Sequence, residues 1–116
     1  MGADVIPLFV PLVAVALLAQ TRSATVLSIG DGDTLRVREG RRTLNVRLAC
    51  IDAPETSQTP HGLSARAQLM ALAPVGSVVE LRLTATDRYG RSLAELSRSG
   101  RNLNQSLVAS GAAFVY

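Results

Sequence analysis

Carboxylates are concentrated in two short turns of this sequence. The chain has nine acidic residues, and Asp31, Asp33, Asp52 and Glu55 all fall in these turns. Clustered carboxylates repel one another, so such a group needs a cation. Oxygen ligands favour a hard ion, Ca²⁺ or Mg²⁺, and we expect Asp33 and Asp52 to bind it by side chain and Ala53 by its carbonyl. Asp-Gly is also common in turns, so Asp31 and Asp33 have an alternative interpretation as turn formers.

Two arginines accompany the acidic turns. Arg47 precedes the second turn, and Arg91 follows a glycine in a later turn. Two carboxylates make a weak metal site, which substrate oxygens and waters should complete. A metal ion with two guanidinium groups suits a phosphate whose charge rises in the transition state. Glu55 would then orient or deprotonate a water.

A strand and a stiff turn must position the second group. Residues 43–51 alternate between apolar and polar, which predicts a strand with Cys50 on its buried face and Arg47 on the other. Pro54 fixes its own φ and keeps Ala53 extended, which stiffens the turn. Cys50 is the single cysteine, so an internal disulfide is excluded, and we expect an inert thiol.

The remaining elements predict a small barrel. Strands are expected over 25–29, 35–38, 43–51, 78–83 and 92–96, with helices over 62–72 and from a cap at Asn102 to Gly111. Five short strands with a helix between the third and the fourth is the order of an OB-type barrel, an α+β fold. Fold alone does not give function.

The first 24 residues differ from the rest. The run 5–19 has no charge and is shorter than the roughly 20 residues that a spanning helix needs. It resembles the apolar centre of a secretory signal, although Asp4 precedes it and no basic residue does. We therefore expect residues 1–24 to be a signal peptide or a membrane anchor and residues 25–116 to be the domain. The protein is then secreted or periplasmic, with membrane contact only if residues 5–19 remain as an anchor.

The charge balance is basic. All twelve basic residues are Arg, the formal net charge is +3 and the sequence pI is about 10.0. Arg matches phosphate oxygens in pairs, so a polyanionic partner is plausible. A compositional bias towards Arg is the alternative explanation for the missing Lys.

Three motifs in this order and spacing resemble the staphylococcal (micrococcal, thermonuclease-like) nuclease family. They are Asp31-Gly32-Asp33-Thr34-Leu35, Arg47-Leu48-Ala49-Cys50-Ile51-Asp52-Ala53-Pro54-Glu55-Thr56 and Asp87-Arg88-Tyr89-Gly90-Arg91. The likeness runs from about Val26 to Tyr116 and includes the helix that begins near Asn104.

The resemblance implies an OB-like barrel and a Ca²⁺-dependent phosphodiesterase that acts on DNA and RNA, single-stranded or locally open, as a monomer. It implies metal binding by Asp33, Asp52 and the carbonyl of Ala53, with Asp31 in support. It implies that Arg47 and Arg91 bind the scissile phosphate and that Glu55 acts on the attacking water. Arg88 and Tyr89 would contact the nucleotide.

Departures from the family leave two rival interpretations open. Family members often have Thr where this chain has Ala53, and Lys where it has Arg88. They also continue into a final helix, which we expect to be missing here. The rivals are an OB-type module that binds nucleic acid without cutting it, and an inactive truncated nuclease.

Overall fold

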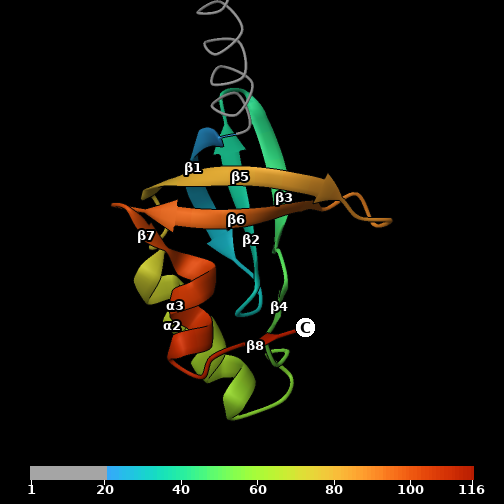
Figure 1. Cartoon of the computed structure of the whole chain (residues 1–116), viewed down its shortest axis with the longest axis vertical. Helices are drawn as coiled ribbons and strands as arrows, with labels where there is room; N and C mark the ends of the chain where they lie inside the picture. The colour runs from blue at the N-terminus through green and yellow to red at the C-terminus, as the bar shows by residue number, and fades with distance from the viewer. Residues whose placement is uncertain (1–20) are drawn as a thin grey trace, which may run out of the picture.

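A closed five-stranded barrel forms the centre of the protein (Figure 1). The structure is a computed structural model and describes residues 21–116. The barrel strands are β1 (Thr21–Ile29), β2 (Thr34–Glu39), β3 (Arg42–Leu48), β5 (Val78–Thr86) and β6 (Ser92–Arg98). Their order is β3-β2-β1-β5-β6, and a parallel pairing of β3 with β6 closes the ring. The predicted OB-type α+β barrel is confirmed.

Alternation along the strands produces the barrel interior. In β2, Leu35 and Val37 are buried while Arg36 and Arg38 are exposed, as the period of two requires. The fully buried side chains are all aliphatic, and the largest are Leu48, Leu69, Leu81, Leu96, Leu103 and Leu107. Burying each of them contributes roughly 1.5–3 kcal/mol. The interior is therefore a rigid support for the loops at its ends.

Two helices lie side by side at one end of the barrel (Figure 1). α2 (His61–Leu72) buries Ala65 and Leu69, and α3 (Leu103–Ala109) buries Leu103 and Leu107. The side chain of Asn102 accepts a hydrogen bond from the N–H of Gln105, which confirms the predicted cap of α3. Short strands complete the fold: β4 (Ile51–Asp52) pairs with β8 (Phe114–Val115), and β7 (Arg101–Asn102) pairs with β6.

The prediction that Cys50 is buried on a strand face is wrong. β3 ends at Leu48, and Cys50 takes the left-handed conformation with φ 62°. This reverses the alternation, so that Ala49 and Ile51 are both buried and Cys50 is exposed. The strand therefore ends at Leu48 rather than at residue 51, and the turn begins three residues earlier than the pattern predicts.

The first strand is longer than the sequence pattern predicts. β1 begins at Thr21, and residues 21–25 pair with β5. Ala24 is buried in the core. In the part of the chain that the structure describes, no helix is both long and apolar enough to cross a membrane. The predicted apolar leader at residues 5–19 lies outside the described residues.

Candidate functional site

The first acidic turn, between β1 and β2, fastens the backbone of the second. The side chain of Asp31 accepts a hydrogen bond from the N–H of Thr56 at 2.9 Å. The side chain of Asp33 accepts one from the N–H of Ala53 at 2.8 Å. Thr34 steadies the first turn, because its hydroxyl accepts from the N–H of Asp31 at 2.8 Å. The two turns predicted from the sequence are therefore neighbours at one end of the barrel.

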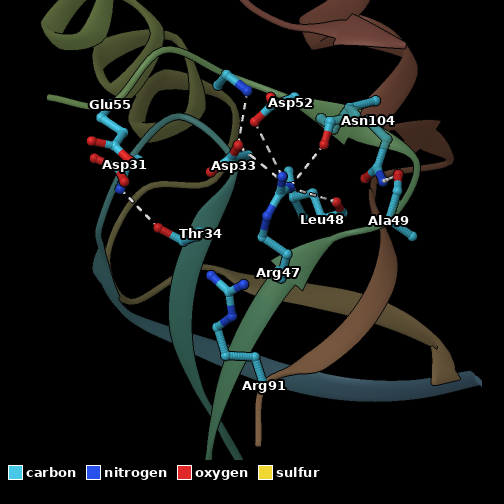
Figure 2. Close-up of polar contacts among 12 residues, drawn as sticks. Asp31, Asp33, Thr34, Arg47, Leu48, Ala49, Asp52, Glu55, Arg91 and Asn104 are labelled. Atoms are coloured by element: carbon cyan, nitrogen blue, oxygen red, sulfur yellow. Dashed lines mark hydrogen bonds and ion pairs between the residues drawn. The ribbon is translucent and has the colours of Figure 1, made fainter. Parts of the chain in front are cut away.

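The guanidinium group of Arg47 lies between the two turns (Figure 2). Its Nη1 donates to the carbonyl oxygens of Leu48 at 3.0 Å and Ile51 at 2.8 Å, and lies 3.3 Å from Asp33 Oδ2. Its Nη2 donates to Asp52 Oδ1 at 3.2 Å. Arg47 therefore ties the β3–β4 turn to both carboxylates. Its Nε–H and one Nη2–H have no partner among residues 21–116, so these two N–H groups of the guanidinium remain available to a ligand.

The two carboxylates beside Arg47 have different environments. The side chain of Asp33 is only 6% exposed, whereas that of Asp52 is 67% exposed. Burial raises the pKa of Asp33 above its ordinary value, and the charges of Asp52 and Asp31 add to this effect. The N–H of Ala53 and the charge of Arg47 act in the opposite direction. The pocket thus contains more negative charge than one guanidinium compensates.

The chemistry of these donors fits a hard divalent cation. Two carboxylates face one positive charge, and the raised pKa of Asp33 means that a further cation would stabilise its ionised form. Within residues 21–116, no cluster of three or more His, Cys, Asp or Glu side chains forms a metal site. Asp33 and Asp52 would hold such an ion together with substrate oxygens and water.

Glu55 lies on the loop after β4, with an exposed side chain on the Asp31 side of the site (Figure 2). Its carboxylate has no hydrogen bond or ion pair with any residue that the structure describes, so it is free to bind water. Its backbone is fixed, because its N–H donates to Gln58 Oε1 at 2.9 Å and its carbonyl accepts from the N–H of Gln58 at 2.8 Å. Gly62, in the first turn of α2, packs directly on this backbone: a Cβ there would overlap the Glu55 carbonyl.

A second glycine brings α2 against the first acidic turn. A Cβ at Gly32 would lie 2.7 Å from the Cβ of Ala65. Neither Gly30 nor Gly32 has a positive φ, so this turn does not need glycine for a left-handed backbone conformation. Close packing explains Gly32, and α2 therefore supports both turns through Gly32 and Gly62. Sequence reasoning missed this function of the two glycines.

Arg91 lies on the same face of the barrel as Arg47. Arg47 is opposite Leu93 in the parallel β3–β6 pairing, and Arg91 immediately precedes the first residue of β6, Ser92. Figure 2 shows both guanidinium groups at this face. The Nε of Arg91 is 2.8 Å from Asp87 Oδ2, which orients the side chain. Its two terminal nitrogens have no hydrogen-bond partner within residues 21–116, so they are available for an anion.

Asp87 organises the turn that carries Arg91. Its Oδ1 accepts hydrogen bonds from the N–H groups of Tyr89 and Arg91, both at 2.9 Å. Desolvation acts to raise the pKa of Asp87, but these hydrogen bonds and the charge of Arg91 outweigh it, so the pKa lies below its ordinary value. Asp87 therefore remains ionised and continues to orient Arg91 under all but strongly acidic conditions.

Arg88 and Tyr89 lie at the tip of the β5–β6 hairpin, which extends away from the barrel (Figure 1). The ring of Tyr89 is 69% exposed, with the Arg88 guanidinium 5.0 Å and the Arg91 guanidinium 5.6 Å from its centroid. The structure brings Tyr89 next to Arg91 but not to the acidic turns. Contact of Arg88 and Tyr89 with a nucleotide stays a prediction.

Asn104 is a buried polar residue that the sequence analysis did not select. Its side-chain amide donates to the carbonyl oxygens of Ala49 at 3.1 Å and Ala94 at 3.3 Å, and its oxygen accepts from the N–H of Leu96 at 3.1 Å. These bonds join α3 to β6 and to the turn after Arg47 (Figure 2). An Asn among the apolar positions of the last helix was the available signal.

The fold and this site define a small OB-type barrel with arginines and carboxylates gathered at one end. A family profile described as staphylococcal nuclease homologue matches residues 45–116. The chain belongs to this family.

Individual relatives agree with the family match. The chain is 38% identical over 92 residues to a protein named uncharacterized endonuclease from Escherichia coli O157:H7. The matched region is 78% of this chain and 59% of the relative. It is 40% identical over 100 residues to a protein named micrococcal nuclease from Shigella flexneri, over 78% of this chain and 56% of that protein. A Haemophilus influenzae protein named uncharacterized endonuclease is 37% identical over 98 residues, covering 84% of this chain and 54% of its own length. The chain thus spans little more than half the length of these relatives.

Proposed function

We propose that this protein is a Ca²⁺-dependent nuclease that hydrolyses phosphodiester bonds of DNA and RNA. The observation that supports the proposal best is the position of Arg47, whose guanidinium contacts Asp33 and Asp52 and lies on the same barrel face as Arg91. Two arginines can stabilise the charge that develops on a phosphate, two carboxylates can hold a cation, and a free carboxylate on a fixed loop can act on water. Relatives named as endonucleases agree with this assignment.

Each side chain has a distinct part in the proposed reaction. Arg91 presents its terminal nitrogens to the non-bridging oxygens of the scissile phosphate, and Arg47 contributes its remaining N–H groups from the neighbouring strand. Both contacts strengthen as charge accumulates on phosphorus in the transition state. Glu55 accepts a proton from the attacking water or orients it. Ca²⁺, when bound by Asp33, Asp52 and the carbonyl of Ala53, supplies Lewis-acid stabilisation of the same charge.

Asp31 and Asp87 support these groups without touching the phosphate. Asp31 accepts from the N–H of Thr56 and so fixes the residue next to Glu55. Asp87 binds Nε of Arg91 and leaves the two terminal nitrogens without a partner in the described chain. The rival non-catalytic module needs nucleic-acid binding alone, and a free carboxylate on a fixed loop has no part in that binding. We further propose that the protein acts as a monomer and is secreted or periplasmic, with a membrane anchor as the alternative.

The test is hydrolysis of labelled single-stranded DNA and RNA by the 116-residue chain in Ca²⁺ and in excess chelator. The expected result is cleavage in Ca²⁺ and none in chelator, with products from both substrates. Cleavage that is indifferent to chelator would contradict the metal proposal. Salt-sensitive binding without product in either condition would favour the non-catalytic module. A thermal melt without a cooperative transition would favour an inactive nuclease domain.

A further inference from the structure

The outer face of the β2–β3 hairpin carries two arginines that no acidic residue neutralises. Arg36 and Arg38 are exposed and have neither an ion pair nor a side-chain hydrogen bond with any residue in 21–116. The strand register surrounds Arg36 with Asn45 and Ser28, and Arg38 with Thr43 and Thr25. All four neighbours are neutral and polar. The charge of this face is therefore open to a ligand from solvent.

Most other arginines of the described chain are engaged with partners. The ion pairs are Arg22 and Arg42 with Glu39, Arg47 with Asp33 and Asp52, Arg82 with Glu95, and Arg91 with Asp87. Arg36 and Arg38 differ from these because neither neighbouring strand places a carboxylate opposite them. Arg101, on β7 at the far edge of the sheet, is also exposed and without an ion pair, so it offers a matched control.

Arg36 and Arg38 lie on the same face of the barrel as the candidate site. Thr34 is opposite Arg47 in the β2–β3 register, so Thr34, Arg36 and Arg38 lie on the same side of the sheet as Arg47. Alternate residues of a strand are about 6.7 Å apart along the backbone, so Arg36 and Arg38 lie successively farther along β2 from the site. Figure 1 shows β2 and β3 running side by side from the β4 end of the protein to their hairpin.

We propose that the outer face of β2 and β3 binds the phosphates of a single-stranded polynucleotide, leading from Arg47 and Arg91 towards the β2–β3 hairpin. The inference rests on the proposed nuclease function and extends it to the nucleotides beyond the scissile bond. A line of arginines one strand wide matches one phosphate backbone, and the flanking hydroxyl and amide groups are further phosphate donors. No aromatic residue is present among the named positions of this face, so the contact is independent of base sequence.

The test measures binding by fluorescence anisotropy, without divalent ions, from about 50 to about 200 mM salt. The probes are labelled oligothymidylates of about 15 and about 3 nucleotides, which exceed and fall short of the proposed path. The variants are Arg36→Gln, Arg38→Gln, the double variant and Arg101→Gln. Thermal melts establish that each variant folds like the wild type, as we expect because all three positions are exposed.

We expect the double variant to lose on the order of tenfold in affinity for the longer probe, with little change for the shorter one. The slope of log affinity against log salt should become shallower by about 0.7 for each arginine removed. Arg101→Gln should leave both quantities near the wild-type values. An unchanged slope in the double variant, or an equal loss in Arg101→Gln, would overturn the proposal.

The outcome separates this inference from the nuclease itself. Salt-sensitive binding that depends on Arg36 and Arg38, with no cleavage in Ca²⁺, would support the surface and refute the nuclease. Cleavage in Ca²⁺ with a wild-type salt slope in the double variant would refute the surface and leave the nuclease standing.

Discussion

Replacing Asn104 should destabilise the protein more than its small side chain suggests. The ladder between β3 and β6 ends with Leu48 opposite Ala94, so the N–H of Leu96 lies beyond the last paired residue. The side-chain oxygen of Asn104 satisfies this N–H, and its amide satisfies the carbonyl of Ala49. Asn104 thus supplies the hydrogen bonds at the end of the β3–β6 pairing, and it fixes the turn that follows β3.

The size of the destabilisation follows from the hydrogen-bonding groups that Asn104→Ala would leave without partners. The N–H of Leu96 and the carbonyl of Ala49 would each be buried and unsatisfied, at about 1–3 kcal/mol per group, or about 2–6 kcal/mol together. The carbonyl of Ala94 keeps the N–H of Ala49 as its donor at 2.8 Å and adds little. The free energy of unfolding of a folded domain is about 5–15 kcal/mol in total, so the expected loss is a large share of it.

Urea denaturation followed by circular dichroism measures this loss as a fall in midpoint with an unchanged m-value. Asn102→Ala is the matched control, because it removes one helix cap and should cost about 1 kcal/mol. Asn104→Asp keeps the shape but places an oxygen against two carbonyls, so it should also destabilise strongly. If Asn104→Ala were no less stable than Asn102→Ala, the assigned role of Asn104 would be refuted.

Three further predictions concern the supports of the site. Gly62→Ala should displace the Glu55 backbone and lower kcat on single-stranded DNA by on the order of a hundredfold. Ala67→Ser, at an exposed position of the same helix, is the control and should leave kcat unchanged. Equal rates for the two variants would contradict the packing of Gly62 on Glu55. The next prediction compares the unfolding free energies of the wild type and Asp33→Asn in chelator. The wild type should gain stability relative to the variant as pH falls through the raised pKa of Asp33 towards 3.8, because the folded protein takes up the proton before the unfolded chain does. A difference that does not change with pH would refute the raised pKa of Asp33. The unfolding free energy of wild type relative to Asp87→Asn should be constant above 3.8 and fall as pH drops through the lowered pKa of Asp87, and a difference that persists in acid would be inconsistent with its ion pair.

The barrel could be predicted because local patterns determine it. Alternation in β2 and β3 and turn residues between them indicate the hairpin directly, and Pro74 and Gly76 mark the end of α2. The β3–β6 closure is different, since it joins strands that are far apart in the sequence. The OB strand order predicted it only indirectly, yet this pairing is what brings Arg91 to Arg47.

The sequence predicted the acidic turns as neighbours but not the contacts that fasten them. Asp33 accepts from the N–H of Ala53, and Arg47 donates to two carbonyls, interactions that depend on backbone placement rather than on residue type. Cys50 shows the same limit, because its left-handed φ interrupts an alternation that otherwise reads as one strand. Gly32 was predicted in a turn and Gly62 at the start of a helix, and only the packing of α2 against the two turns explains why both are glycine.

The most direct test of the central claim compares Glu55→Gln with Glu80→Gln in the rate of single-stranded DNA hydrolysis in Ca²⁺. Glu80 is an exposed carboxylate on β5, so its replacement controls for the change in charge. We expect Glu55→Gln to lower kcat by about a hundredfold or more and Glu80→Gln to cleave at the wild-type rate. Equal rates for the two variants would contradict the claim that the carboxylates and arginines at this end of the barrel act together on one phosphate.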